Sequence, residues 1–216
     1  MQAGPEMVDW IDSFTKRNEI KDLPKSVDGY EIRIFDNPEE LDNAIVQKAN
    51  NEDTALSRII ATYDWEYSSN HRPENSLKKY WEVMIEKWSK PWNRELKPKL
   101  SKKEKRQNDG LAWAEQKHTI GEVGSTFTIQ GFDLNYAGVI LGPSVKYRDG
   151  KIVFDPSESF NKKATRNRTL SDGSKKKYGE TLIQHEIRVL MTRGVNGMYI
   201  YACDEELRNA LKKAVK

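Results

Sequence analysis

Two short segments carry the residues best suited to chemistry. Residues 126–133 read TFTIQGFD, and residues 187–201 read IRVLMTRGVNGMYIY. Arg193, in the second segment, is of interest because a planar guanidinium can hydrogen-bond several phosphoryl oxygens at once. Such an arginine typically contributes about 10³–10⁵ in rate to phosphoryl transfer. A plainer interpretation places Arg193 at a helix C-terminus, where a cation is favoured in any protein.

The first segment combines a Gln-Gly pair with hydroxyl groups. Gly131 lacks a Cβ, so backbone amides there can approach a phosphate or ribose closely. Thr126 and Thr128 could donate to a nucleic-acid phosphate. They are equally suited to starting a helix, and this alternative stays open.

Aromatic and basic residues elsewhere favour a polyanionic partner. Tyr63, Trp65 and Tyr67 alternate after an apolar run, so they share a face on which nucleic-acid bases could stack. They could instead cover the core. Residues 87–106 hold nine basic and two acidic side chains, and residues 161–179 hold seven and one. The candidate phosphate contacts in the first run are Lys102, Lys103, Lys105 and Arg106, although a lysine run can also be a solvated face.

Several classes of site are absent from the sequence. No Gly-x-x-x-x-Gly-Lys-Ser/Thr motif is present, and Gly121-Glu-Val-Gly124-Ser-Thr126, the nearest imitation, has no lysine. Three scattered histidines and Cys203 give no metal-ligand spacing, so we expect no metal site. A single cysteine fits a reducing cytoplasm. No apolar run approaches the roughly twenty residues that span a bilayer, so we expect a cytoplasmic protein without membrane contact.

The order of elements predicts an α/β fold. Strands are expected at 30–35, 57–64, 137–141 and 198–202, and helices at 37–49, 181–192 and 205–215. Strand–helix–strand order builds a mainly parallel sheet with helices on both faces. Residues 66–110 are expected to form an irregular insertion, rich in Trp and Lys, with one helix at 77–88. Residues 145–180 are expected to form a hairpin followed by a basic, mobile segment.

The two segments resemble motifs V and VI of superfamily 1 helicases, in this order and about sixty residues apart. The wider frame GSTFTIQGFDLNYAGVILGP … VLMTRGVNGMYIYACDEEL resembles the Schlafen group 3-like DNA/RNA helicase domain. The resemblance is strong over residues 121–211 and weaker back to Asp9.

This resemblance implies a fold and a function. Residues 1–216 would form a single second RecA-like domain of an ATP-dependent helicase or translocase, with the P-loop domain outside this chain. Arg193 would be the arginine finger, and Gln130, Gly131 and Asp133 would contact the nucleotide. ATP and Mg²⁺ would be bound mainly by the missing domain. The expected partners are that domain and single-stranded DNA or RNA, and the chain alone should not hydrolyse ATP.

This sequence departs from the family pattern at two positions. Asp133 stands where relatives usually have Glu, which questions a ribose contact. Phe127 stands where many relatives have His or Asp, so any coupling that those side chains provide in relatives is missing here or is made by other residues. A Pro-Trp-Asn element at 91–93 resembles one of the family, but no role for it follows from the sequence.

A stand-alone single-stranded nucleic-acid-binding module, with Arg193 a relic, is the alternative function. A nuclease using Asp64, Glu66, Asp133 and Asp155 finds no support in their spacing.

Overall fold

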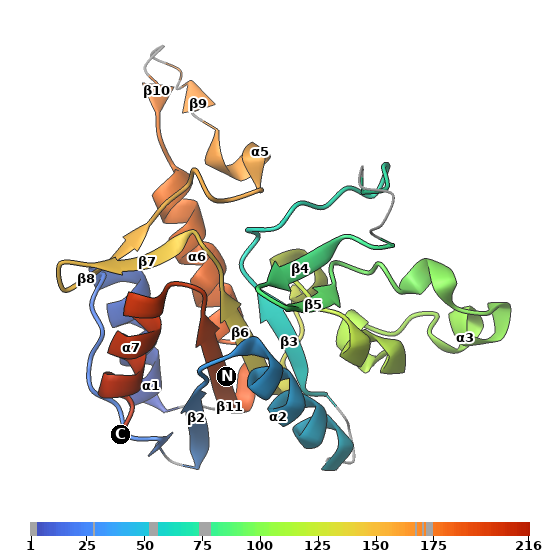
Figure 1. Ribbon diagram of the computed structural model, residues 1–216, viewed down its shortest axis with the longest axis horizontal. Coiled ribbons are helices and arrows are strands. Elements are labelled where there is room, and N and C mark those ends of the chain that lie inside the picture. Colours follow the sequence, from blue (N-terminus) through green and yellow to red (C-terminus); the bar gives the residue numbers. More distant parts are fainter. Residues whose placement is uncertain are drawn as a thin grey trace.

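A five-stranded, mainly parallel sheet forms the centre of the protein (Figure 1). The structure, a computed structural model, describes residues 4–27, 29–51, 56–73, 79–166, 168–169, 171 and 175–216. In spatial order the strands are β1 Ser26–Val27, β2 Tyr30–Ile34, β11 Gly194–Ala202, β6 Leu134–Leu141 and β3 Arg58–Ala61. β2, β11, β6 and β3 run parallel, whereas the edge strand β1 is antiparallel to β2. The predicted α/β class and mainly parallel sheet are therefore confirmed.

β6 and β11, the strands with a parallel neighbour on each side, are apolar on both faces beyond their first residues, as strands covered on both sides must be. Tyr199 of β11 lies opposite Gly138 of β6, and Ile200 lies opposite Val139. Both strands begin earlier than predicted. Gly194 and Gly197, expected as the stop after a helix, belong to β11, and the register shifts between them.

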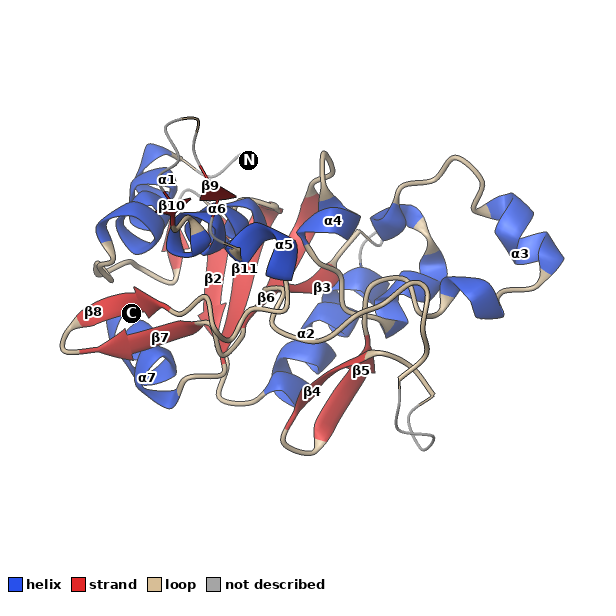
Figure 2. Ribbon diagram, turned by 90° about the horizontal axis from the view of Figure 1, so that it is seen from above, coloured by secondary structure: helices blue, strands red, loops and turns tan. Residues whose placement is uncertain are grey.

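Helices cover both faces of the sheet, as predicted (Figure 2). Their bounds are α1 Pro5–Asp12, continued by a π-helical turn at Ser13–Arg17, then α2 Pro38–Asn51, α6 Gly179–Met191 and α7 Glu205–Ala214. One face, which includes Met198 and Ile200, packs against α1, α6 and α7. The other, which includes Tyr199, packs against α2 and a separate hairpin. Gly138 lets α2 approach closely, because a Cβ there would lie 2.7 Å from Ile45.

That hairpin, β4 Glu82–Ile85 and β5 Trp88–Pro91, corrects the predicted helix at 77–88. The described part of that range, from Lys79 onward, contains no helix. Val83 and Ile85 are buried whereas Met84 between them is exposed, so the apolar period is two residues and not 3.6. Glu86, with φ +52°, turns the chain between the strands.

The rest of the insertion, and the chain from its end to β6, form short helices and turns. They are the 3₁₀ turns Lys97–Lys99, Trp113–Glu115 and Lys117–Gly121, and the helices α3 Lys102–Gln107 and α4 Thr126–Ile129. Isolated bridges join Gly124 to Ile60 of β3, and Val123 to Trp92. None of the described residues of 66–110 adds a strand to the central sheet.

The segment after β6 begins with the predicted hairpin, β7 Val145–Arg148 and β8 Lys151–Phe154. It continues through α5 Lys162–Thr165 and a two-stranded pair, β9 Arg168–Thr169 and β10 Lys175–Lys176. The mobility expected for this segment stays a prediction, and several of its residues lie outside the described part. Within the described residues, no helix is long and apolar enough to cross a membrane.

Candidate functional site

Arg193 and Asp133 meet at the edge of the sheet where β6 and β11 begin. Arg193 follows α6, and its carbonyl accepts a hydrogen bond of 2.8 Å from the amide of Leu134, the first residue of β6. This contact brings the two strand starts together. One guanidinium nitrogen of Arg193 lies 3.3 Å from Oδ1 of Asp133. The sequence-based hypothesis gave these residues separate roles, and the ion pair between them was not foreseen.

The backbone also holds the Arg193 side chain. Its Nε donates to the carbonyl of Val189 at 3.0 Å, and NH1 donates to the carbonyl of Phe132 at 3.4 Å. The Arg193 side chain is nevertheless 21% exposed, and that of Asp133 is 45% exposed. The guanidinium is thus positioned at the surface with a partner that water also reaches.

The Gln-Gly pair lies beside this ion pair, at the end of α4. Gln130 ends the helix, and Gly131 follows with φ +76°, a conformation that side chains with a Cβ rarely adopt. No atom lies within 4 Å of a Cβ built on Gly131, so the backbone there faces open space. Gly131 therefore has a conformational reason to be glycine, beside the predicted close approach of a ligand. Gln130, Gly131 and Asp133 are all exposed.

The helix start at Ser125 accounts for Thr128. The Thr128 hydroxyl accepts from the Ser125 amide at 2.7 Å and donates to the Ser125 carbonyl at 2.9 Å, which completes a capping box. This geometry agrees with the helix-start alternative for Thr128. Thr126 instead lines a neighbouring pocket. A phosphate contact by either threonine stays a prediction.

The Pro-Trp-Asn element supports the same helix start, a role that the sequence did not reveal. The Ser125 hydroxyl donates to Oδ1 of Asn93 at 2.6 Å. Asn93 is buried with φ +55°, and Trp92 before it is fully buried. Asn93 therefore positions α4, and with it Gln130 and Gly131. The resemblance of the Pro-Trp-Asn element to one of the family was the signal available.

Tyr63 and Trp65 pack on the insertion. Tyr63 lies 5.5 Å, ring centre to ring centre, from Trp92, and Trp65 lies 6.3 Å from it. The indole Nε1 of Trp65 donates to the carbonyl of Met84 in β4 at 3.1 Å. This agrees with the core-covering alternative for Trp65, whereas Tyr63 also contacts the exposed ring of Phe127 at 5.5 Å. Base stacking on either residue stays a prediction.

The basic residues of α3 lie far from Arg193. The helix begins with a capping box between Ser101 and Glu104, and every residue of it is exposed. In both views α3 stands at one end of the molecule, away from α6 (Figures 1 and 2). The predicted phosphate contacts Lys102, Lys103, Lys105 and Arg106 therefore form a surface separate from the strand-start edge.

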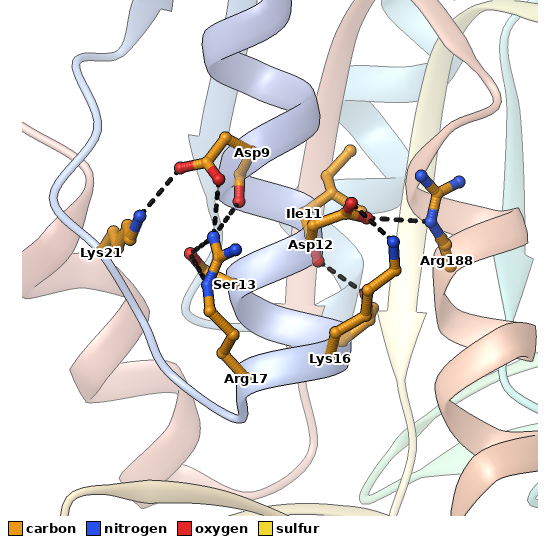
Figure 3. Close-up of polar contacts among 9 residues, drawn as sticks. Asp9, Ile11, Asp12, Ser13, Lys16, Arg17, Lys21 and Arg188 are labelled. Carbon is orange, nitrogen blue, oxygen red and sulfur yellow. Dashed lines mark hydrogen bonds and ion pairs between the residues drawn. The ribbon is translucent and has the colours of Figure 1, made fainter.

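Arg188, near the end of α6, has a structural role. Its Nε lies 3.0 Å from Oδ1 of Asp12 in α1, and Asp12 also pairs with Lys16 at 2.7 Å (Figure 3). This pair joins α6 to α1, which gives Arg188 a structural role. Arg188 and Arg193 thus offer a matched comparison on the same helix end.

No metal centre accompanies these residues. Across the part of the chain that the structure describes, no three His, Cys, Asp or Glu side chains are grouped so that they could hold a metal ion.

The fold and this edge define a mixed α/β domain whose conspicuous surface arginine lies between a helix and an inner parallel strand. The model of the family "Schlafen group 3, DNA/RNA helicase domain" matches residues 1–204. The chain belongs to this family.

A relative in Saccharomyces cerevisiae, the uncharacterized protein YPL245W, is 30% identical over 234 residues, which cover 99% of this chain and 46% of the relative. The chain therefore spans about half the length of that relative. No solved structure matches the chain.

Proposed function

We propose that the chain is the second RecA-like domain of an ATP-dependent, superfamily 1-type helicase or translocase. In this proposal Arg193 completes an ATP site whose phosphate-binding lysine lies in a P-loop domain outside these residues. The helicase-domain family supports the proposal, as does the mainly parallel sheet with helices on both faces.

The observation that carries the proposal is the position of Arg193. Its guanidinium is partly exposed and pairs with Asp133, which follows the exposed Gln130 and Gly131 closely in the chain. Solvent-exposed ion pairs contribute only about 0–1 kcal/mol, so phosphoryl oxygens could replace Asp133 at little cost. Asp133 would then hold the finger ready while no nucleotide is present.

The residues at this edge fit half of an ATP site. Arg193 supplies a cation and a hydrogen-bonding fork, Gln130 supplies an exposed amide, and the backbone at Gly131 faces open space. A guanidinium suits the negative charge that spreads over the transferred phosphoryl oxygens in the transition state. Since the described residues offer no grouped metal ligands, we assign Mg²⁺ to the P-loop domain.

The nucleic-acid part of the proposal depends on charge. The exposed basic residues of α3 would contact phosphates without reading sequence. The same surface also favours the alternative function, a nucleic-acid-binding module without motor activity.

ATP turnover in the protein that joins this chain to its P-loop domain tests the motor proposal. Arg193→Ala should lower turnover by about 10³ or more, as for other arginine fingers, with a much smaller change in nucleotide affinity. Arg193→Lys should restore little, because an ammonium cannot reproduce the guanidinium fork. Arg188→Ala, from the same helix end, is the matched control and should leave turnover nearly normal.

Two results would contradict the proposal. One is near-normal turnover in a folded Arg193→Ala protein. The other is ATP hydrolysis by residues 1–216 alone that a single substitution in this chain abolishes.

A further inference from the structure

Phe127 is an exposed aromatic residue at the candidate site. Phe127 is 60% exposed, more than any other large apolar residue in the part of the chain that the structure describes. Tyr63 contacts it edge to face, with ring centres 5.5 Å apart and planes at 89°. An aromatic ring held in place by another ring while mostly in solvent is a surface on which a planar ligand can stack.

Phe127 also lines a pocket of about 480 Å³ between α4, α6 and the segment before α5. Ligand pockets generally have volumes of this order. The apolar part of the lining includes Leu182 and Ile183 of α6. Hydrogen-bonding groups come from three elements, namely Gln130, Asn161 and Glu186. The pocket therefore combines a stacking surface with groups that can read the edge of a planar polar ring.

Glu186 is a partly buried acid in the lining of this pocket. Its Oε1 accepts a hydrogen bond of 2.9 Å from the amide of Tyr63, and no other hydrogen bond to its carboxyl comes from the residues that the structure describes. Burial, and then the neighbouring Asp64, raise the pKa of Glu186 to about 8. At neutral pH the group is thus mostly a carboxylic acid, which donates as well as accepts.

Two basic residues form a rim next to the pocket lining on the α5 side. Lys162 follows the lining residue Asn161, and its Nζ donates to the carbonyl of Ser159 at 2.8 Å. Arg166 follows the lining residue Thr165 and has an exposed side chain. This charge favours a ligand that carries phosphate outside the pocket.

We propose that this pocket holds one nucleobase of a single-stranded nucleic acid, with the base stacked on Phe127 and its edge hydrogen-bonded to Glu186. The ligand class follows from the aromatic surface, the polar interior and the basic rim together, and it rests on the proposed function for the nucleic-acid partner. An apolar peptide could pack on the Phe127 ring, but it would gain nothing from the basic residues beside the pocket. Phe127, a departure from the family pattern, thereby acquires a role in binding.

The test compares two oligomers with the same number of phosphates. One is an oligothymidylate or oligouridylate of about twelve nucleotides, and the other is the matching abasic chain. Fluorescence anisotropy gives a dissociation constant for each oligomer. The dissociation constant of the abasic chain divided by that of the normal oligomer measures the part of binding that depends on bases. Phe127→Ala should reduce that ratio by about 5- to 150-fold, the range for one stacked base, and should leave the abasic chain and the salt slope unchanged.

Matched variants separate stacking from a general loss of structure. Phe127→Tyr should keep the ratio, because it keeps the ring. Val153→Ala removes an exposed apolar group on β8, outside the pocket lining, and should change nothing. Glu186→Gln keeps a donor and an acceptor, so base-dependent binding should persist.

The outcomes distinguish this proposal from the function on which it rests. Equal binding of both oligomers by the wild-type protein would exclude a base pocket while leaving phosphate contacts intact. An unchanged ratio in Phe127→Ala, or an equal loss for both oligomers, would also overturn it. Failure to bind either oligomer would overturn both proposals at once, whereas normal ATP turnover in Arg193→Ala would leave the pocket standing.

Discussion

Two arginines at strand starts show how differently the same residue can be used in this protein. Arg58 is the first residue of β3, and it is only 3% exposed. Its Nε donates to the Thr119 hydroxyl at 2.8 Å, and its other nitrogens donate to the carbonyls of Ser57 and Gln116. Arg193, just before β11, has a surface carboxylate as its partner and keeps a fifth of its side chain exposed.

The difference indicates where chemistry can occur. The turns at 113–121 cover Arg58, so its hydrogen bonds serve to join these turns to the sheet. Arg193 also donates to backbone carbonyls, but it keeps 21% of its side chain exposed and its ionic partner, Asp133, is 45% exposed. A buried cation in a full set of hydrogen bonds is costly to move, whereas an exposed ion pair can be exchanged for a ligand.

The contrast predicts a large loss of stability for one variant and a small loss for the other, and this is the largest change in stability that we expect. Arg58→Ala should lower the free energy of unfolding by about 3 kcal/mol, because it removes a buried side chain together with the hydrogen bonds that it donates to the Thr119 hydroxyl and to the carbonyls of Ser57 and Gln116. Arg193→Ala should lower it by at most about 1 kcal/mol. Denaturant midpoints with unchanged m-values measure both.

Equal losses of stability in the two variants would break the comparison. Arg193 would then be a structural residue like Arg58, and its assignment as a finger would lose its physical basis.

Most of the fold could be predicted because its inner strands are continuous apolar runs. β6 and β11 read as buried strands from sequence, and α2 was recognisable from Asn37, whose side chain accepts from the Glu40 amide at 2.8 Å, and from Pro38. The insertion could not be predicted in the same way. The run WEVMIEKW could bury its apolar residues either as a helix or as a hairpin. Only its contact with α2 and the sheet, which the sequence does not show, decides between the two.

The site was predictable only as separate residues. Arg193, Gln130 and Gly131 stood out through their motif context, which also placed them near one another. Their partners depend on tertiary contacts between distant segments. Asn93 reaches Ser125 across 32 positions, and Tyr63 meets Glu186 across 123. Glu186, next to Ile187 on an amphipathic helix, reads from sequence as an ordinary solvent-facing acid.

Two carboxyls with raised pKa values extend the contrast between the covered and the open region. Glu122, which accepts from the Trp113 indole at 3.2 Å, belongs to the covered region, where burial raises its pKa to about 7. Glu186 lines the open pocket, with a pKa of about 8. Both values lie above the ordinary 4.5, so the folded protein keeps protons that the unfolded chain releases. Stability from these groups is therefore present at low pH and is lost as pH rises from about 4.5 to the folded pKa.

Glu186→Gln should remove the part of this pH-dependent loss of stability that comes from Glu186. Each carboxyl contributes a slope of at most about 1.4 kcal/mol per pH unit within its window. Glu186 has the higher pKa of the two, so the variant should flatten the decline most toward pH 8 and leave the remaining decline to Glu122. Asp64 and the Tyr63 amide face Glu186 and remain in the variant. Unfolding midpoints across this range measure the effect, and an unchanged curve above pH 7 would show that Glu186 is ionised in the folded state.

The smallest effect concerns the basic surface of α3, which is even more exposed than the Arg193 edge. Replacing Lys102 and Lys103 by Ala should weaken binding of single-stranded oligomers. The salt slope should fall by about 0.7 for each phosphate that the protein no longer neutralises. Stability should hardly change, because the capping box of α3 uses Ser101 and Glu104 and not these lysines.

Lys212 and Lys213 on α7 are a matched pair at the opposite end of the molecule (Figure 1). Their replacement by Ala removes the same net charge. If nucleic acid binds along α3, the α7 variant should bind it with a nearly unchanged salt slope. An equal reduction in both variants would mean that net charge alone attracts the polyanion, and α3 would then be a solvated face with no particular role in binding.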